Sequence, residues 1–200
     1  MKSVLISTRP KLVEKICHKI GEDETGKAIY EKRIEVRKSA PKEVPFKCYI
    51  YETKGQYVKF THGAHTKYGY GRGKVIGWFI CDKVDEYNFH NGLVAFNSMG
   101  LPSGFYGSYL IFEDDYESMC LSYDEVKNYG KGKTLYGWHI SNLTLYDRPK
   151  ELSEFRKPCD RFLDCCTCRR LVRNEYMSCD NKINRPPLSW CYVEELGEEE

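Results

Sequence analysis

The sequence predicts an α+β protein with a curled β-sheet, a few helices and a C-terminal zinc-binding extension. Short runs rich in β-branched and aromatic residues are separated by glycines along the chain, which is typical of strands and turns. One helical repeat follows the first run, and six of the ten cysteines lie between Cys159 and Cys191. With 200 residues, 41% of them hydrophobic, we expect a main domain over residues 1–150 and an extension over 151–200.

The first expected elements are a strand, a helix and a second strand. Residues 3–7 are apolar enough for an inner strand. Residues 10–21 begin with a proline, and their apolar residues Leu12, Ile16 and Ile20 recur at helical spacing, which predicts a helix. Residues 29–37 alternate in polarity, which predicts a strand with its charged side chains together on one exposed face, namely Arg33, Glu35 and Arg37.

Further strands and short helices are expected along the rest of the chain. Residues 85–121 lack a clear period and predict an irregular insertion or a long loop. The pattern from Ser122 to Glu125 is a capping box, which predicts a short helix ending at Gly130. Residues 151–155 favour another short helix. The remaining strands are expected at 46–52, 57–61, 74–84, 135–140, 143–146 and 189–193.

The clustered cysteines predict a structural zinc site. A C-x2-C spacing allows two thiolates to reach one ion, and two later cysteines complete a tetrahedral set. Four thiolates leave no open position for water or substrate, so catalysis is not expected at this metal. The expected ligands are Cys165, Cys168, Cys179 and Cys191, and Cys159 or Cys166 remain alternatives for one of them.

Charge and apolar patterning limit the classes of partner. The formal net charge of +2 hides a basic body, because an acidic tail follows it from Glu194 to Glu200. Clusters of Lys and Arg at residues 27–47 and 67–74 suit contact with nucleic acid, although solvated faces explain such runs equally well. No stretch is long and apolar enough for a membrane span or a secretory core, so we expect a cytoplasmic protein that does not bind membranes.

Three short motifs occur in a characteristic order. The segment from Lys32 to Arg37 reads K-x-x-E-x-R, residues 74–79 read KVIGWF, and residues 135–140 read LYGWHI. In this order, after an N-terminal strand and helix, they resemble the ASCH domains, which are small β-barrels of the PUA-like superfamily. The resemblance covers about residues 1–150. The continuation through the clustered cysteines is similar to uncharacterised ASCH-like proteins of Firmicutes and their phages.

The resemblance implies a small barrel with a basic cleft that holds RNA or a nucleotide base. Lys32 and Arg37 would neutralise phosphate there, and Glu35 would accept from an amine or orient Arg37. Stacking of one base on an aromatic ring contributes about 1–3 kcal/mol. The expected ligand-binding residues are Lys32, Glu35, Arg37, Lys38, Tyr136, Trp138 and His139.

Several alternatives stay open at this point. Glu35 and Arg37 can form a surface ion pair that binds nothing, and Trp138 can be a core residue. The resemblance also implies a candidate activity, because some ASCH-like proteins use the signature lysine to hydrolyse an amide on a modified cytidine, and others are nucleases. Lys32 matches that lysine, but Glu35 replaces the threonine of the amidohydrolase type. A hydrolase with Lys32 and Glu35 as candidate catalytic residues is one alternative, and a phage or host regulator that binds another protein is a second.

Overall fold

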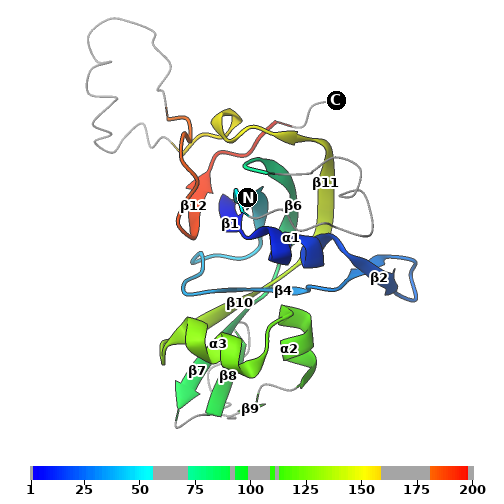
Figure 1. The fold of residues 1–200 in the computed structure, drawn as a ribbon, viewed down its shortest axis with the longest axis vertical. Coiled ribbons are helices and arrows are strands. Elements are labelled where there is room, and N and C mark those ends of the chain that lie inside the picture. The colour runs from blue at the N-terminus through cyan, green and yellow to red at the C-terminus, as the bar shows by residue number, and fades with distance from the viewer. Residues whose placement is uncertain are drawn as a thin grey trace, which may run out of the picture.

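The computed structural model describes residues 2–55, 72–90, 93–98, 109–110, 113–158 and 181–197. Two five-stranded sheets and one two-stranded sheet make up this part of the chain, with short helices beside them (Figure 1). The elements in chain order are β1 Lys2–Thr8, α1 Pro10–Cys17, β2 Lys19–Glu22, β3 Ala28–Tyr30, β4 Ile34–Arg37, β5 Phe46–Glu52, β6 Val75–Cys81, β7 Val84–His90, β8 Leu93–Ser98, β9 Tyr109–Leu110, α2 Glu113–Met119, α3 Tyr123–Gly130, β10 Leu135–His139, β11 Ser141–Lys150, the 3₁₀ helix η2 Leu152–Glu154 and β12 Trp190–Val193.

The first sheet has the strand order β11-β6-β5-β1-β12 and contains both strand orientations. Strands β1 and β5 run parallel, while the other three pairs are antiparallel. The C-terminal strand β12 lies at the edge of this sheet, where Leu5 of β1 is opposite Cys191. The last described residues therefore pack on the same sheet as the N-terminal strand (Figure 1).

The second sheet has the order β4-β10-β7-β8-β9 and is antiparallel throughout. The chain passes directly from the first sheet to the second between β6 and β7, and back between β10 and β11. The ladders do not close into one barrel within the described residues. The α+β class is confirmed, whereas a closed barrel and a zinc-binding extension are not shown in this part of the chain.

Three apolar clusters hold these layers together. The first joins β1, β5 and β6 to α1 and to Trp138 of β10, so it fills the space between the sheets. The second lies on the other face of β1 and β5, where Leu5 and Tyr49 pack under Leu152 and Phe155. The third lies between the second sheet and helices α2 and α3, around Ile34. Alternate residues of β1 and β5 thus face two different cores.

The N-terminal helix is shorter than the apolar repeat predicted. Helix α1 ends at Cys17, and the next residues form β2, which pairs with β3. The Asp23 carboxylate accepts hydrogen bonds from the backbone N–H groups of Thr25 and Lys27, and this local turn closes the hairpin. Ile20 is consequently 56% exposed and does not extend the helix's apolar face.

Candidate ligand-binding sites

The predicted signature residues form a buried charge network. Lys32, Glu35 and Arg37 are 1%, 3% and 6% exposed, respectively. Arg37 Nη2 lies 2.8 Å from Glu35 Oε1, and Lys32 Nζ lies 3.4 Å from Glu35 Oε2. Lys32 Nζ also donates to the backbone oxygen of Met119 at 2.6 Å. Each side chain therefore has a partner inside the protein.

Arg37 links three segments that are distant in sequence. Its Nη2 donates to Ser7 O at 3.0 Å and to Thr8 Oγ1 at 3.2 Å, both at the end of β1. Its Nη1 donates to Ser189 O at 3.3 Å, just before β12. The guanidinium thus satisfies backbone carbonyls that meet where the two sheets approach each other.

The exposed strand face predicted for β4 is not present. All four residues of this strand are buried, because Ile34 and Val36 pack toward α2 and α3 while Glu35 and Arg37 turn inward. Alternation correctly separated the two sets of side chains, but it did not show that both sides of the strand are covered. Ligand binding by Lys32, Glu35 and Arg37 stays a prediction.

The aromatic residues of β10 divide between core and surface. Trp138 is fully buried, with its ring centroid 5.1 Å from that of Phe46 and 5.7 Å from that of Trp190. This is the core alternative considered for Trp138 from the sequence. Tyr136 and His139 are partly exposed, and His139 Nε2 forms a hydrogen bond with the buried carboxylate of Asp85.

An exposed lysine directly after the signature strand β4 lies over a tyrosine ring of α3. Lys38 follows β4, and its Nζ lies 4.9 Å from the ring centroid of Tyr129 on α3. Both residues are exposed, and burial of part of the ring raises the pKa of the Tyr129 hydroxyl, an effect that Arg37 and Arg9 oppose. We call Arg9, Lys38 and Tyr129 the Tyr129 face.

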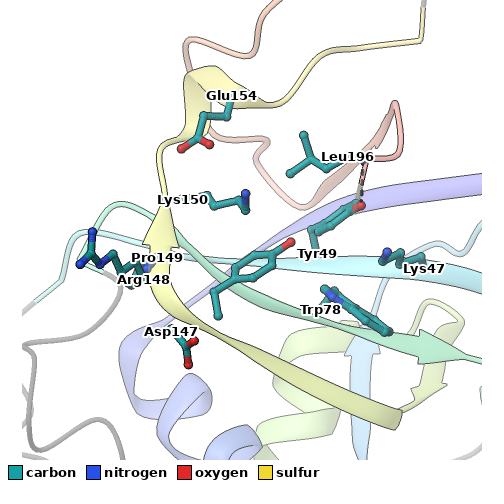
Figure 2. A pocket seen from close by; sticks show the side chains of 11 residues that line it. Lys47, Tyr49, Trp78, Asp147, Arg148, Pro149, Lys150, Glu154 and Leu196 are labelled. Atoms are coloured by element: carbon teal, nitrogen blue, oxygen red, sulfur yellow. Dashed lines mark hydrogen bonds between the residues drawn. The ribbon is translucent and has the colours of Figure 1, made fainter. Parts of the chain in front are cut away.

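A hollow of about 780 Å³ lies on the outer face of the first sheet (Figure 2). Within it, Lys47 Nζ lies 4.4 Å from the ring centroid of Trp78 and 5.6 Å from that of Tyr49. The same ammonium is 3.2 Å from the Glu195 carboxylate. The lining residues are Lys47, Tyr49, Trp78, Tyr146, Asp147, Arg148, Pro149, Lys150, Glu154, Leu196 and Gly197.

This hollow was not identified from the sequence, although one signal was available. In the segment from Phe46 to Glu52, Lys47 and Tyr49 alternate with apolar residues, so they share one face of β5. The remaining walls come from β6, β11, η2 and the C-terminal segment. Their proximity depends on the strand order, which periodicity does not provide.

The zinc site predicted from the cysteines falls largely outside the described residues. Cys165, Cys168 and Cys179 lie there, as do the alternatives Cys159 and Cys166. Cys191 is described: it is partly buried in β12, and burial raises the pKa of its thiol. The zinc site therefore stays a prediction, and no group of three metal-ligating side chains occurs within the described ranges.

Among the helices of the described ranges, none has the length and apolar character needed to cross a membrane.

No protein-family model and no curated protein matches this sequence. Similarity does appear among solved structures. A crystal structure of ASCH from Zymomonas mobilis aligns with a TM-score of 0.50 and 13% identity, covering 97% of this chain and 89% of the other.

A structure of a single-substitution mutant of that Zymomonas mobilis protein aligns with a TM-score of 0.43 and 12% identity, covering 98% and 92% of the two chains. The alignment with the first structure extends over nearly the whole of this chain. At this identity it concerns the arrangement of strands and helices. The chain therefore has the fold of an ASCH domain.

Proposed function

We propose that this protein binds single-stranded RNA or a nucleotide, and that the Tyr129 face makes the contact. The observation that carries the proposal is the exposed Lys38 ammonium 4.9 Å from the Tyr129 ring centroid, directly after the signature strand. Arg9 is also exposed, and its charge acts against the burial that raises the pKa of the Tyr129 hydroxyl. A ring with neighbouring cations suits a base and its phosphate.

The chemistry of each group supports a distinct part of this contact. A base stacked on Tyr129 would contribute about 1–3 kcal/mol, largely independent of base identity. Lys38 and Arg9 would approach phosphates and make the binding sensitive to salt. The ASCH fold adds support, because the PUA-like superfamily that the sequence resembles uses a cleft for RNA or a base.

The buried network would support this surface from behind. Glu35 and Arg37 lie on β4 just before Lys38, and Arg37 joins that strand to β1 and to Ser189. Their hydrogen bonds fix the backbone from which Lys38 projects. In this proposal the signature residues position the contact, while exposed residues beside them touch the ligand.

The test is a fluorescence-anisotropy titration of a labelled single-stranded RNA with the full chain. We expect Tyr129→Leu and Lys38→Ala each to weaken binding by about fivefold or more, at unchanged melting temperature. Lys27→Ala is a matched control, because it removes one exposed lysine from the β2–β3 turn. Equal binding by all four proteins would reject the Tyr129 face, and absence of binding would reject the function.

A hydrolase acting on RNA or a modified nucleoside is a second candidate, which one observation favours. His139 is partly exposed and is oriented by the buried carboxylate of Asp85, whose other oxygen lies 3.1 Å from Lys83 Nζ. An imidazole held by a carboxylate is suited to proton transfer. Mass spectrometry of RNA and of a cytidine that carries an amide modification, after incubation with the protein, tests this candidate, and activity retained in His139→Gln would remove His139 from it.

A further inference from the structure

We infer that the hollow in Figure 2 binds a nucleoside monophosphate, with its phosphate on Lys47 and its base against the aromatic wall. The hollow lies on the face of β1 and β5 that is opposite the core between the two sheets. It is therefore separate from the Tyr129 face on α3. This inference does not depend on RNA binding there.

Lys47 is the cation from which the inference begins. Its side chain is only 7% exposed, and a buried ammonium is costly unless an anion pairs with it. The anion in this structure is the Glu195 carboxylate, 3.2 Å away on a side chain that is 43% exposed. The buried Lys47 ammonium is therefore paired with the carboxylate of an exposed side chain, Glu195. An incoming phosphate can replace that carboxylate.

Two further cations lie along β11 at the same hollow. Arg148 and Lys150 line it, and Lys150 Nζ is 5.4 Å from the ring centroid of Tyr146. Asp147 and Glu154 are the acidic residues of the lining, so cations exceed carboxylates by one before Glu195 is considered. This balance favours an anionic ligand.

The aromatic wall determines the rest of the ligand. Trp78, Tyr49 and Tyr146 line the hollow together, and Figure 2 labels the rings of Trp78 and Tyr49, which both lie close to Lys47. A volume of about 780 Å³ falls in the range of about 300–1,000 Å³ that small-molecule sites occupy. Inorganic phosphate would make no stacking contact with the aromatic rings, and an uncharged nucleoside would not replace Glu195 at Lys47. A flat base joined to a phosphate can both stack on the rings and pair with Lys47.

The C-terminal segment competes with such a ligand. The Glu195 carboxylate forms an ion pair with the Lys47 ammonium. The backbone N–H of the next residue, Leu196, donates to the Tyr49 hydroxyl at 3.1 Å. Binding of a phosphate at Lys47 must displace the Glu195 carboxylate. Removal of its charge in Glu195→Gln should consequently strengthen binding, whereas removal of the Lys47 charge should weaken it.

The experiment is isothermal titration calorimetry of the full chain with adenosine and uridine monophosphates, and separately with adenosine and inorganic phosphate. We expect saturable binding of at least one monophosphate, about tenfold weaker in Lys47→Met and about threefold tighter in Glu195→Gln. Arg148→Gln removes a cation at an exposed position, so it tests the site even if Lys47→Met fails to fold. It should weaken binding several-fold.

Lys27→Ala removes an exposed lysine from the β2–β3 turn, outside both proposed sites, so it is the matched control and should leave monophosphate binding unchanged. Absence of saturable binding in both the native protein and Glu195→Gln would overturn the inference. So would inorganic phosphate binding as tightly as the monophosphates, or equal affinities of the native protein, Glu195→Gln and Arg148→Gln. Loss of monophosphate binding in Lys38→Ala would place the ligand on the Tyr129 face instead. RNA binding is measured separately, so each proposal can fail without the other.

Discussion

Arg37 and Glu35 form an ion pair inside the protein, with Arg37 Nη2 2.8 Å from Glu35 Oε1 and both side chains buried. The same guanidinium reaches the backbone oxygens of Ser7 and Ser189, which belong to opposite ends of the chain. The K-x-x-E-x-R signature therefore contributes a connection between the sheets. Its arginine has a structural role in addition to any role in binding.

The first prediction concerns this connection. Arg37→Ala should lower the free energy of unfolding by about 3–5 kcal/mol, because it leaves Glu35 buried beside one fewer cation and removes donors from buried carbonyls. Urea unfolding followed by tryptophan fluorescence measures this loss. Arg33→Ala serves as the control, since Arg33 is exposed on the neighbouring loop. A loss below about 1 kcal/mol would contradict the structural role.

The second prediction concerns the close approach of β6 and β11 at Gly77. A Cβ atom on Gly77 would lie 2.2 Å from the backbone oxygen of Thr144 and 2.9 Å from Leu145 Cα. Gly77→Ala should therefore destabilise the protein by about 1–3 kcal/mol, because backbone atoms must move. Gly21→Ala is the control, since its Cβ would have no neighbour within 4 Å. Thermal melting of both variants tests this, and equal melting temperatures would contradict the observed strand spacing.

The third prediction concerns pH and Glu52. Burial raises the pKa of Glu52 from 4.5 to about 7, while Arg72 opposes the shift. The folded state then binds more protons than the unfolded state between these two values, so stability should fall as pH rises through this window. One pKa unit corresponds to about 1.4 kcal/mol, which gives a loss of up to about 3 kcal/mol.

Glu52→Gln should remove this part of the pH dependence and become the more stable protein above pH 7. Urea unfolding at several pH values between about 4.5 and 8 measures the difference between the two proteins. Parallel stability profiles for the native protein and Glu52→Gln would show that Glu52 titrates as an ordinary exposed carboxylate.

The fourth prediction concerns the metal. The native protein, purified without chelators, should contain one zinc per chain, measured by elemental analysis, and Cys168→Ser should lose it. Cys48→Ser is the control, since Cys48 is buried in the core between the sheets. Zinc retained in Cys168→Ser, or absent from the native protein, would reject the predicted ligand set.

Local patterns predicted several of the local elements, but the irregular insertion or long loop expected at residues 85–121 is wrong, because this interval holds most of β7 together with β8, β9 and α2. The capping box at Ser122 does begin α3, with Glu125 N donating to Ser122 Oγ and the Glu125 carboxylate accepting from Ser122 N. The strands predicted at 135–140 and 189–193 also agree with β10 and β12. These features depend on residues close in sequence, whose spacing fixes their geometry.

Features that depend on distant segments were harder to predict. Alternation in β4 placed Glu35 and Arg37 on one side of the strand, but it did not show that β1 and the residues before β12 cover that side. The hollow around Lys47 also joins β5, β11 and the C-terminal segment, and its existence follows from the strand order. Sequence periodicity alone carries no such information.

The salt dependence of RNA binding tests the central claim most directly. For single strands, the slope of log affinity against log salt is about −0.7 per phosphate neutralised. We predict that the Arg9→Ala, Lys38→Ala double variant has a slope smaller in magnitude by about 1.4 than the native protein, while Lys27→Ala keeps the native slope. Native slopes in the double variant, or no RNA binding by the native protein at low salt, would contradict an RNA contact at the Tyr129 face.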